Sequence, residues 1–114
     1  MGLRLLNYRD VEIEDRLRWL IRGPHFDMRM VEVEASGGPP EKPHVHPWEH
    51  EIFIVEGKGA VWDGEKRRPF GEGDAIYVPS GEAHSFINLG EKVLRFICCI
   101  PAGVDLKQIK HADR

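Results

Sequence analysis

The sequence predicts an all-β protein, an antiparallel sandwich or barrel that forms one domain over residues 1–114. Three observations support this class. Twelve glycines and eight prolines, in short clusters, separate brief apolar runs of strand length. No segment keeps a helical period between caps over several turns. A chain of this length can bury one core but is too short for a second one.

The expected strands follow from the apolar runs between these clusters. They span Leu17–Ile21, Phe26–Glu34, Glu51–Glu56, Gly59–Trp62, Ala75–Val78, His84–Asn88 and Val93–Ile100. Glycine and proline clusters at 37–40, 71–73, 79–81 and 89–90 separate them. Asp63-Gly64 predicts a hairpin turn after the fourth strand, because glycine tolerates a positive φ. Only Val104–Lys110 is expected to form a short helix.

Composition narrows the class of protein. A net charge of −3 and a pI near 6.1 give no reason to expect nucleic-acid binding, which usually requires a basic surface. No apolar run approaches the roughly 20 residues of a membrane helix, and the first ten residues lack a signal-peptide core. Cys98 and Cys99 are adjacent and should point to opposite faces of a strand, so two free thiols are expected. A cytoplasmic protein is the expectation.

Four of the six histidines predict a metal site. His44, His46 and His50 share one parity, with Pro47 marking a bend or bulge between them. His84 lies on a separate strand after the 79–81 turn. A barrel that brings these strands together would gather four imidazole nitrogens around one divalent ion at about 2.0–2.2 Å. His25 and His111 stand alone and are interpreted as surface or hydrogen-bonded residues.

Two glycine- and histidine-containing patterns resemble the signatures of the cupin superfamily. The first, G-x5-H-x-H-x3,4-E-x6-G, is matched in part by Gly38, His44, His46 and Gly57, with His50 in place of the glutamate. The second, G-x5-P-x-G-x2-H-x3-N, is matched by Gly73, Pro79, Gly81, His84 and Asn88. The resemblance covers Gly38–Asn88. It implies a double-stranded β-helix, or jelly-roll barrel, with little helix and with metal-binding motifs at 38–57 and 73–88.

The sequence departs from the usual pattern at the glutamate ligand. Glu51 could take that role through the longer form of the motif, but the six residues between His50 and Gly57, together with the parity of His50, favour His50. The stretch from His46 to Phe53 also resembles small four-histidine manganese cupins. That resemblance implies manganese as the metal and a homodimer as the assembly.

Four neutral imidazoles would leave the full +2 charge on a divalent ion inside a barrel of low dielectric constant. Such a site should favour an anionic ligand at its remaining positions. Six-coordinate manganese or iron would keep two positions open, whereas zinc would keep few or none. Nickel, copper and zinc bind nitrogen ligands more tightly, so the sequence alone does not fix the metal.

Parity also suggests which residues surround the ion. The expected pocket residues are Phe86, Phe96, Cys98, Ile100 and Arg29. For Cys98 the alternative is a buried structural thiol, and for Arg29 it is a solvated strand residue that binds no anion. Glu49 and Glu51 either accept hydrogen bonds from ligand imidazoles or lie on the surface as ordinary carboxylates. Trp48 is interpreted as a packing or interface residue.

The leading functional hypothesis is a metal-dependent enzyme acting on a small, anionic or enolizable molecule. Resemblance to cupin dioxygenases implies oxidation by dioxygen. The alternatives are redox-silent lyase, isomerase or cyclase chemistry, and a non-catalytic metal- and ligand-binding module. No catalytic residue is predicted beyond the metal ligands. A homodimer is also expected from the residues themselves, because the apolar run Ile52–Val55 suggests burial on both faces.

Overall fold

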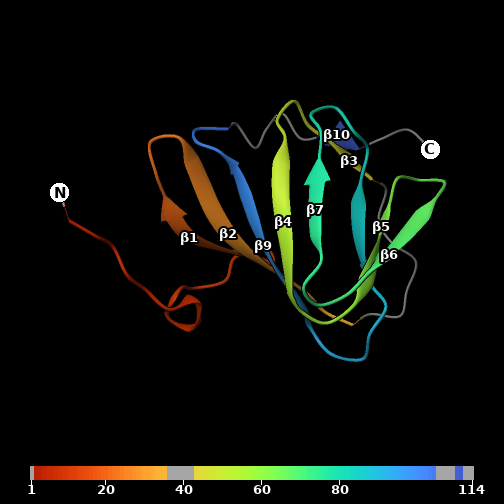
Figure 1. Ribbon diagram of the computed structural model, residues 1–114, viewed down its shortest axis with the longest axis horizontal. Coiled ribbons are helices and arrows are strands. Elements are labelled where there is room, and N and C mark those ends of the chain that lie inside the picture. The colour runs from red at the N-terminus through yellow and green to blue at the C-terminus, as the bar shows by residue number, and fades with distance from the viewer. Residues whose placement is uncertain (1, 36–42, 105–109, 112–114) are drawn as a thin grey trace.

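The all-β class is confirmed in a computed structural model that describes residues 2–35, 43–104 and 110–111 (Figure 1). The strands are β1 (Leu17–Arg22), β2 (Phe26–Val33), β3 (His44–Val45), β4 (His50–Glu56), β5 (Gly59–Trp62), β6 (Arg67–Phe70), β7 (Ala75–Val78), β8 (Ser85–Asn88), β9 (Leu94–Pro101) and β10 (Lys110–His111). The single helical element among the described residues is a 3₁₀ turn, η1 (Tyr8–Asp10). None of the described helical segments has the length and apolarity to cross a membrane.

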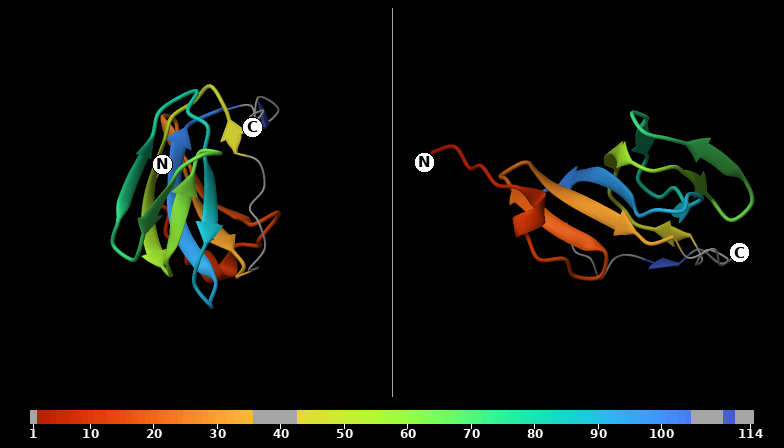
Figure 2. Two further views of the ribbon diagram at one scale, coloured as in Figure 1. Left: turned by 90° about the vertical axis from the view of Figure 1, so that its right-hand side faces the viewer. Right: turned by 90° about the horizontal axis from the view of Figure 1, so that it is seen from below.

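The strands form three antiparallel sheets. The largest has the order β1-β2-β9-β4-β7, the second is β6-β5-β8, and the third pairs β10 with β3. In Figure 1, β1 and β2 lie at one end of the molecule and the β5–β6 hairpin at the other. The right-hand view of Figure 2 shows the same separation. The β1–β2 end of the large sheet therefore extends beyond the β6-β5-β8 sheet.

All seven expected strands are present, with ends that shift by at most one residue. The Asp63-Gly64 hairpin is also confirmed: Gly64 has a φ of 104°, and the Asp63 carboxylate accepts hydrogen bonds from the backbone N–H groups of Glu65 and Lys66. The sequence missed β6, whose Arg-Arg-Pro sequence contains no apolar run. It also missed the two-residue strands β3 and β10. Most of the expected helix, residues 105–109, lies outside the described part of the chain, but Lys110 lies in β10.

The core lies between the sheets and is set by strict alternation along two strands. On β9, Leu94, Phe96, Cys98 and Ile100 are each at most 2% exposed, while the residues between them are half-buried. On β4, Ile52 and Ile54 are buried in the same cluster. Because side chains alternate along a strand, His50 faces inward with these two isoleucines. The packed core therefore fixes the orientation of a predicted metal ligand.

The outer face of β4 corrects one expectation. Within a single chain, Ile52–Val55 is not buried on both faces, because Phe53 is 48% and Val55 41% exposed. Tyr77, on the neighbouring strand β7, is 56% exposed. In the described part of the chain no second layer covers this part of the large sheet, so the alternate residues of the apolar run reach its outer surface.

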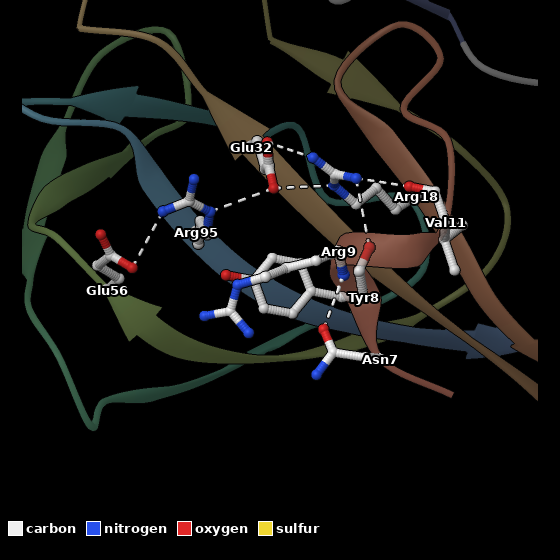
Figure 3. Close-up of polar contacts among 8 residues, drawn as sticks. All are labelled: Asn7, Tyr8, Arg9, Val11, Arg18, Glu32, Glu56 and Arg95. Carbon is white, nitrogen blue, oxygen red and sulfur yellow. Dashed lines mark hydrogen bonds and ion pairs between the residues drawn. The ribbon is translucent and has the colours of Figure 1, made fainter. Parts of the chain in front are cut away.

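The same outer face carries a charge-balanced network at its other end (Figure 3). Glu32 Oε2 accepts hydrogen bonds from Arg18 Nε at 3.0 Å and from Arg95 Nε at 3.2 Å, and Arg95 Nη1 binds Glu56 at 3.0 Å. The Tyr8 ring lies under the guanidinium groups of Arg18 and Arg95. Burial raises the pKa of Glu32, but the hydrogen bonds and charges of the two arginines outweigh it and hold the pKa below 4.5.

Candidate metal centre

Three of the predicted ligands converge in the interior. The ligand nitrogens of His46, His50 and His84 all lie within 4.8 Å of one another. His50 Nε2 and His84 Nε2 are 3.1 Å apart. The three side chains are 7%, 4% and 3% exposed, respectively. Two ligands placed side by side at about 2.1 Å from one ion are about 3.0–3.4 Å apart in octahedral or tetrahedral geometry, so the His50–His84 spacing suits a shared metal.

Backbone pairing brings the three histidines together from separate segments. His50 opens β4, opposite Val78 of β7. His84 precedes β8 and exchanges two backbone hydrogen bonds with His44 of β3, at 2.7 and 3.0 Å. His46 follows β3, and its carbonyl accepts a hydrogen bond from Gly81 N at 2.9 Å. Gly81 has a φ of 79°, which a residue with a side chain rarely adopts, so this motif glycine helps to join the loop before His84 to His46.

The contacts of the other ring nitrogen, Nδ1, orient two of the three imidazoles. His46 Nδ1 lies 2.9 Å from the Trp48 carbonyl, and His84 Nδ1 lies 2.8 Å from the Glu82 carbonyl. A carbonyl oxygen only accepts hydrogen bonds, so each Nδ1 carries the proton and each Nε2 keeps a lone pair for a metal. His50 Nδ1 instead contacts Cys98 Sγ at 3.1 Å. The Trp48 ring stacks on His46 with centroids 4.3 Å apart.

Burial keeps these imidazoles neutral. Burial, together with the charges of neighbouring groups, lowers the pKa of His50 to about 2. The same two effects, against the hydrogen bond to the Glu82 carbonyl, lower the pKa of His84 to about 4. Burial likewise lowers the pKa of His46, against the effect of its hydrogen bond to Trp48. Metals bind the neutral form of histidine, so the three side chains are in the ligand form at neutral pH. These residues can hold a metal ion.

His44 lies beside this group but is not one of the three. Its ring centroid is 6.2 Å from that of His84, in an edge-to-face arrangement, and its side chain is half-buried. The backbone pair with His84 keeps it next to the site. Its role as a fourth ligand stays a prediction. Outside the cluster, His25 is exposed, and the His111 side chain lies outside the described residues.

Glu49 and Glu51 do not contact the ligand imidazoles, so that expectation is wrong and the surface alternative holds. Both are exposed, and Glu49 accepts a hydrogen bond from the Tyr77 hydroxyl at 3.0 Å. Their odd positions beside His50 turn them to the outer side. Cys98 and the carbonyls of Trp48 and Glu82 hold the imidazoles instead. Backbone carbonyls leave no mark in a sequence, although each here lies two residues from its histidine.

The expected pocket residues have different surroundings. Phe86 lies edge-on to the rings of His84 and His50, with centroid distances of 5.7 and 6.3 Å. Arg29 is 9% exposed and donates from Nη2 to Cys98 Sγ at 3.0 Å, so the solvated alternative for Arg29 is wrong. Phe96 and Cys98 belong to the packed core rather than to an open wall. Parity identified their face correctly but could not show that the interior is filled there.

Two clefts reach the histidines from different sides. The smaller, of about 330 Å³, is lined by His50 and Ile100 together with Glu49 and Glu51. The larger, of about 750 Å³, lies between the β5–β6 hairpin and β7 and contains His84. We call it the hairpin cleft. Its lining combines apolar side chains with the charged residues Asp63, Lys66, Arg68, Asp74 and Glu82. A volume of this size admits a small organic molecule.

The fold and the site have counterparts among known proteins. The profile of the family described as "Cupin domain" matches residues 29–100. An oxalate-binding protein of Thermotoga maritima is 40% identical over 58 residues, which are 50% of this chain and 48% of that protein. The chain therefore spans about half the length of this curated relative.

Solved structures resemble nearly the whole chain. The polyketide cyclase RemF of Streptomyces resistomycificus is similar with a TM-score of 0.80 and 25% identity, over 99% of this chain and 87% of that one. A cupin 2 conserved barrel domain protein of Salinispora arenicola has a TM-score of 0.67 and 22% identity, over 95% and 92%. The expected double-stranded β-helix fold is thus confirmed.

Proposed function

The chain belongs to the cupin domain family, and from that membership we propose that it is a metal-dependent enzyme acting on a small anionic molecule. The observation that carries this proposal is the convergence of three buried, neutral imidazoles whose ligand nitrogens lie within 4.8 Å. His46, His50 and His84 would hold one divalent ion. His44, on the adjacent backbone pair, would complete the set as the fourth ligand.

The charge around the site favours an anion as the substrate. Four neutral ligands cancel none of the charge of a divalent ion, and Arg29 adds a buried guanidinium group close by. Burial of uncompensated charge is costly, so a carboxylate or enolate bound at the centre would lower the free energy of the complex. The bound metal would supply Lewis acidity and, as manganese or iron, a site for dioxygen chemistry.

The residues of the chain would position the metal and limit access to it. The carbonyls of Trp48 and Glu82 hold two imidazoles in the required tautomer. Phe86 covers two of the rings with an apolar edge. The hairpin cleft would admit the substrate next to His84. We propose oxidation by dioxygen as the reaction.

A redox-silent cyclisation is the second candidate. It is favoured by the similarity, over 99% of the chain, to a structure named as a polyketide cyclase. A non-catalytic ligand-binding role is the third, and it is favoured by the 40% identity to a protein named as oxalate-binding.

The deciding experiment combines metal analysis with oxygen uptake. Protein purified from its native host would be analysed for bound metal and then screened, manganese- or iron-loaded, against enolizable and aromatic acids. Oxygen consumption that depends on both metal and acid would support the oxygenase. Acid turnover without oxygen consumption would favour the cyclase, and tight acid binding without turnover the binding module. A chain with all four histidines that binds no divalent metal at micromolar concentration would overturn all three.

We also propose that the protein is a homodimer formed through the outer face of its large sheet. Phe53, Val55 and Tyr77 are exposed there, and the extended N-terminal segment presents Leu3 and Leu5 almost fully to solvent. A second copy would cover these apolar side chains. Sedimentation should give a dimer at micromolar concentration, and Phe53→Asp should shift it to monomer. A monomeric wild-type profile would contradict the proposal.

A further inference from the structure

Two arginines and a tryptophan gather on the inner face of the β1–β2 end. The guanidinium carbon of Arg22 lies 3.8 Å from the Trp19 ring centroid, and that of Arg29 lies 5.3 Å from it. Trp19 and Arg29 are cross-strand neighbours in the register of β1 and β2. The aromatic ring therefore holds two like charges close together, an arrangement that an anion would stabilise.

No carboxylate of the described residues pairs with Arg29. Its side chain is 9% exposed, and its Nε is buried without a hydrogen-bond partner in the described part of the chain. Among the described residues, its single side-chain hydrogen bond runs to the sulfur of Cys98, a weak acceptor. A buried charge without a counter-charge is costly to maintain, so a group kept in this state is well suited to bind an anion from outside.

Arg29 is also adjacent to the metal centre. Arg29 Nη2 and His50 Nδ1 contact the same Cys98 sulfur, at 3.0 and 3.1 Å. Arg29 thus lies on the β2 side of His50, whereas the hairpin cleft approaches His84 from the β7 side. Arg29 and the hairpin cleft therefore lie on different sides of the imidazole cluster.

The exposure of the three side chains decreases from Arg22 to Arg29. Arg22 is exposed and Trp19 is half-buried, whereas Arg29 is buried. Figure 1 shows β1 and β2 at the end of the molecule away from the β5–β6 hairpin, so the hairpin does not cover them. The face therefore has one arginine at the surface and one in the interior. The single carboxylate beside them is Asp27, which lies opposite Arg22 and accepts a hydrogen bond from Gly23 N at 3.1 Å, with no ion pair to either arginine among the described contacts.

We propose that Trp19, Arg22 and Arg29 form an anion subsite beside the metal centre. The subsite would hold the carboxylate at one end of a ligand whose other end binds the metal. This inference rests on the proposed metal-dependent function and narrows its substrate class. The ligand is an organic acid with two separated anionic groups, such as a dicarboxylate, rather than a simple monocarboxylate.

The test is calorimetric titration of manganese-loaded protein with acetate and with a series of dicarboxylates from oxalate to glutarate. For the wild-type protein we expect at least one dicarboxylate to bind about tenfold more tightly than acetate. Arg29→Met should remove that preference while acetate binding changes less than about threefold. Arg29→Lys should retain part of it, because a lysine keeps the charge but not the planar donor pair.

Two further variants keep the test informative. Arg22→Ala changes an exposed side chain and should fold, and it should weaken the preferred dicarboxylate by about threefold or more. Arg18→Met removes the same charge from the outer face of the sheet and should leave all binding constants unchanged. Near-ultraviolet circular dichroism and the manganese affinity of each variant would establish that fold and metal site are intact.

The outcomes separate the two proposals. If wild-type protein prefers no dicarboxylate over acetate, or if folded Arg29→Met and Arg22→Ala both keep the preference, the subsite is wrong and the metal-dependent function stands. If the loaded wild-type protein binds no acid at all, both proposals fail. Loss of dicarboxylate preference in Arg29→Met and Arg22→Ala, but not in Arg18→Met, would support the subsite.

Discussion

The arginines on the two faces of the large sheet have different partners. On the outer face, Arg18 and Arg95 share Glu32, and Arg95 also binds Glu56, so charges of both signs meet within the chain. On the inner face, Arg29 meets a sulfur and an aromatic ring but no carboxylate of the described residues. Strand β2 supplies both Arg29 and Glu32, three positions apart and therefore on opposite faces.

This difference indicates which face balances its charges within the chain and which face would bind ions from outside. The outer network pairs each of its two arginines with a carboxylate of the same chain. The inner region concentrates neutral imidazoles, a buried guanidinium group and a buried thiol, and the hydrogen bonds that join these groups involve no carboxylate of the described residues. Such an arrangement gains stability from a bound cation together with its anion. The two faces should therefore respond separately to substitutions and to acid.

The largest expected effect is the loss of metal affinity when a ligand imidazole is removed. His50→Ala should weaken divalent-metal binding by more than about 100-fold, because it removes a donor at the centre of the cluster. Glu51→Gln, the matched neighbour on the outer side, should change the affinity less than about twofold. Competition titration with a chromophoric chelator measures both. Equal losses would transfer the ligand role to Glu51.

Acid should act on the two faces in separate pH windows. In the metal-free protein the pKa values of His50 and His84 lie near 2 and 4, below the ordinary 6.5, so the unfolded state binds more protons once the pH falls below about 6.5. The free energy of unfolding should fall from there by about 1.4 kcal/mol per pH unit for each histidine. Glu32 has a pKa held below 4.5. Its contribution to the free energy of unfolding should therefore be lost only as the pH falls below that value.

Denaturant unfolding at pH 7, 5.5 and 4 measures these windows. Glu32→Gln should leave the slope between pH 6.5 and 5 unchanged, because it alters only the outer face. His84→Gln should reduce that slope. A wild-type stability that stays constant from pH 7 to 5 would show that the histidines are not kept neutral by burial.

Glu32→Gln should also lower stability at neutral pH by about 1–2 kcal/mol, because two half-buried guanidinium groups lose their shared carboxylate. Metal affinity should not change, since the residue faces away from the centre. Urea unfolding measures the free energy of unfolding, and metal titration measures the metal affinity. A clear loss of metal affinity would show that the two faces are coupled.

The smallest effect is expected at the link between His50 and Arg29. Cys98→Ala removes the sulfur that both contact and should weaken metal binding by about tenfold. Cys98→Ser, which keeps a hydrogen-bonding atom, should retain most of the affinity. Unchanged affinity in Cys98→Ala would reduce Cys98 to a packing residue.

The sequence by itself determined the all-β class, seven of the strands, the hairpin at Asp63 and the inward orientation of His50. Each of these depends on local rules: alternation along a strand, turn chemistry and motif spacing. The same rules identified His46 and His84 as partners of His50, because parity and the resemblance to cupin motifs agreed.

The tertiary structure decided what surrounds those residues. Parity turned Phe96 and Cys98 inward, but packing made them part of a filled core. Parity alone did not decide whether Arg29 is solvated or buried. The pairing of β2 with β9 placed it against Cys98, without an ion pair to a described carboxylate. Alternation is a property of one strand, whereas burial and charge balance depend on distances between strands far apart in the sequence.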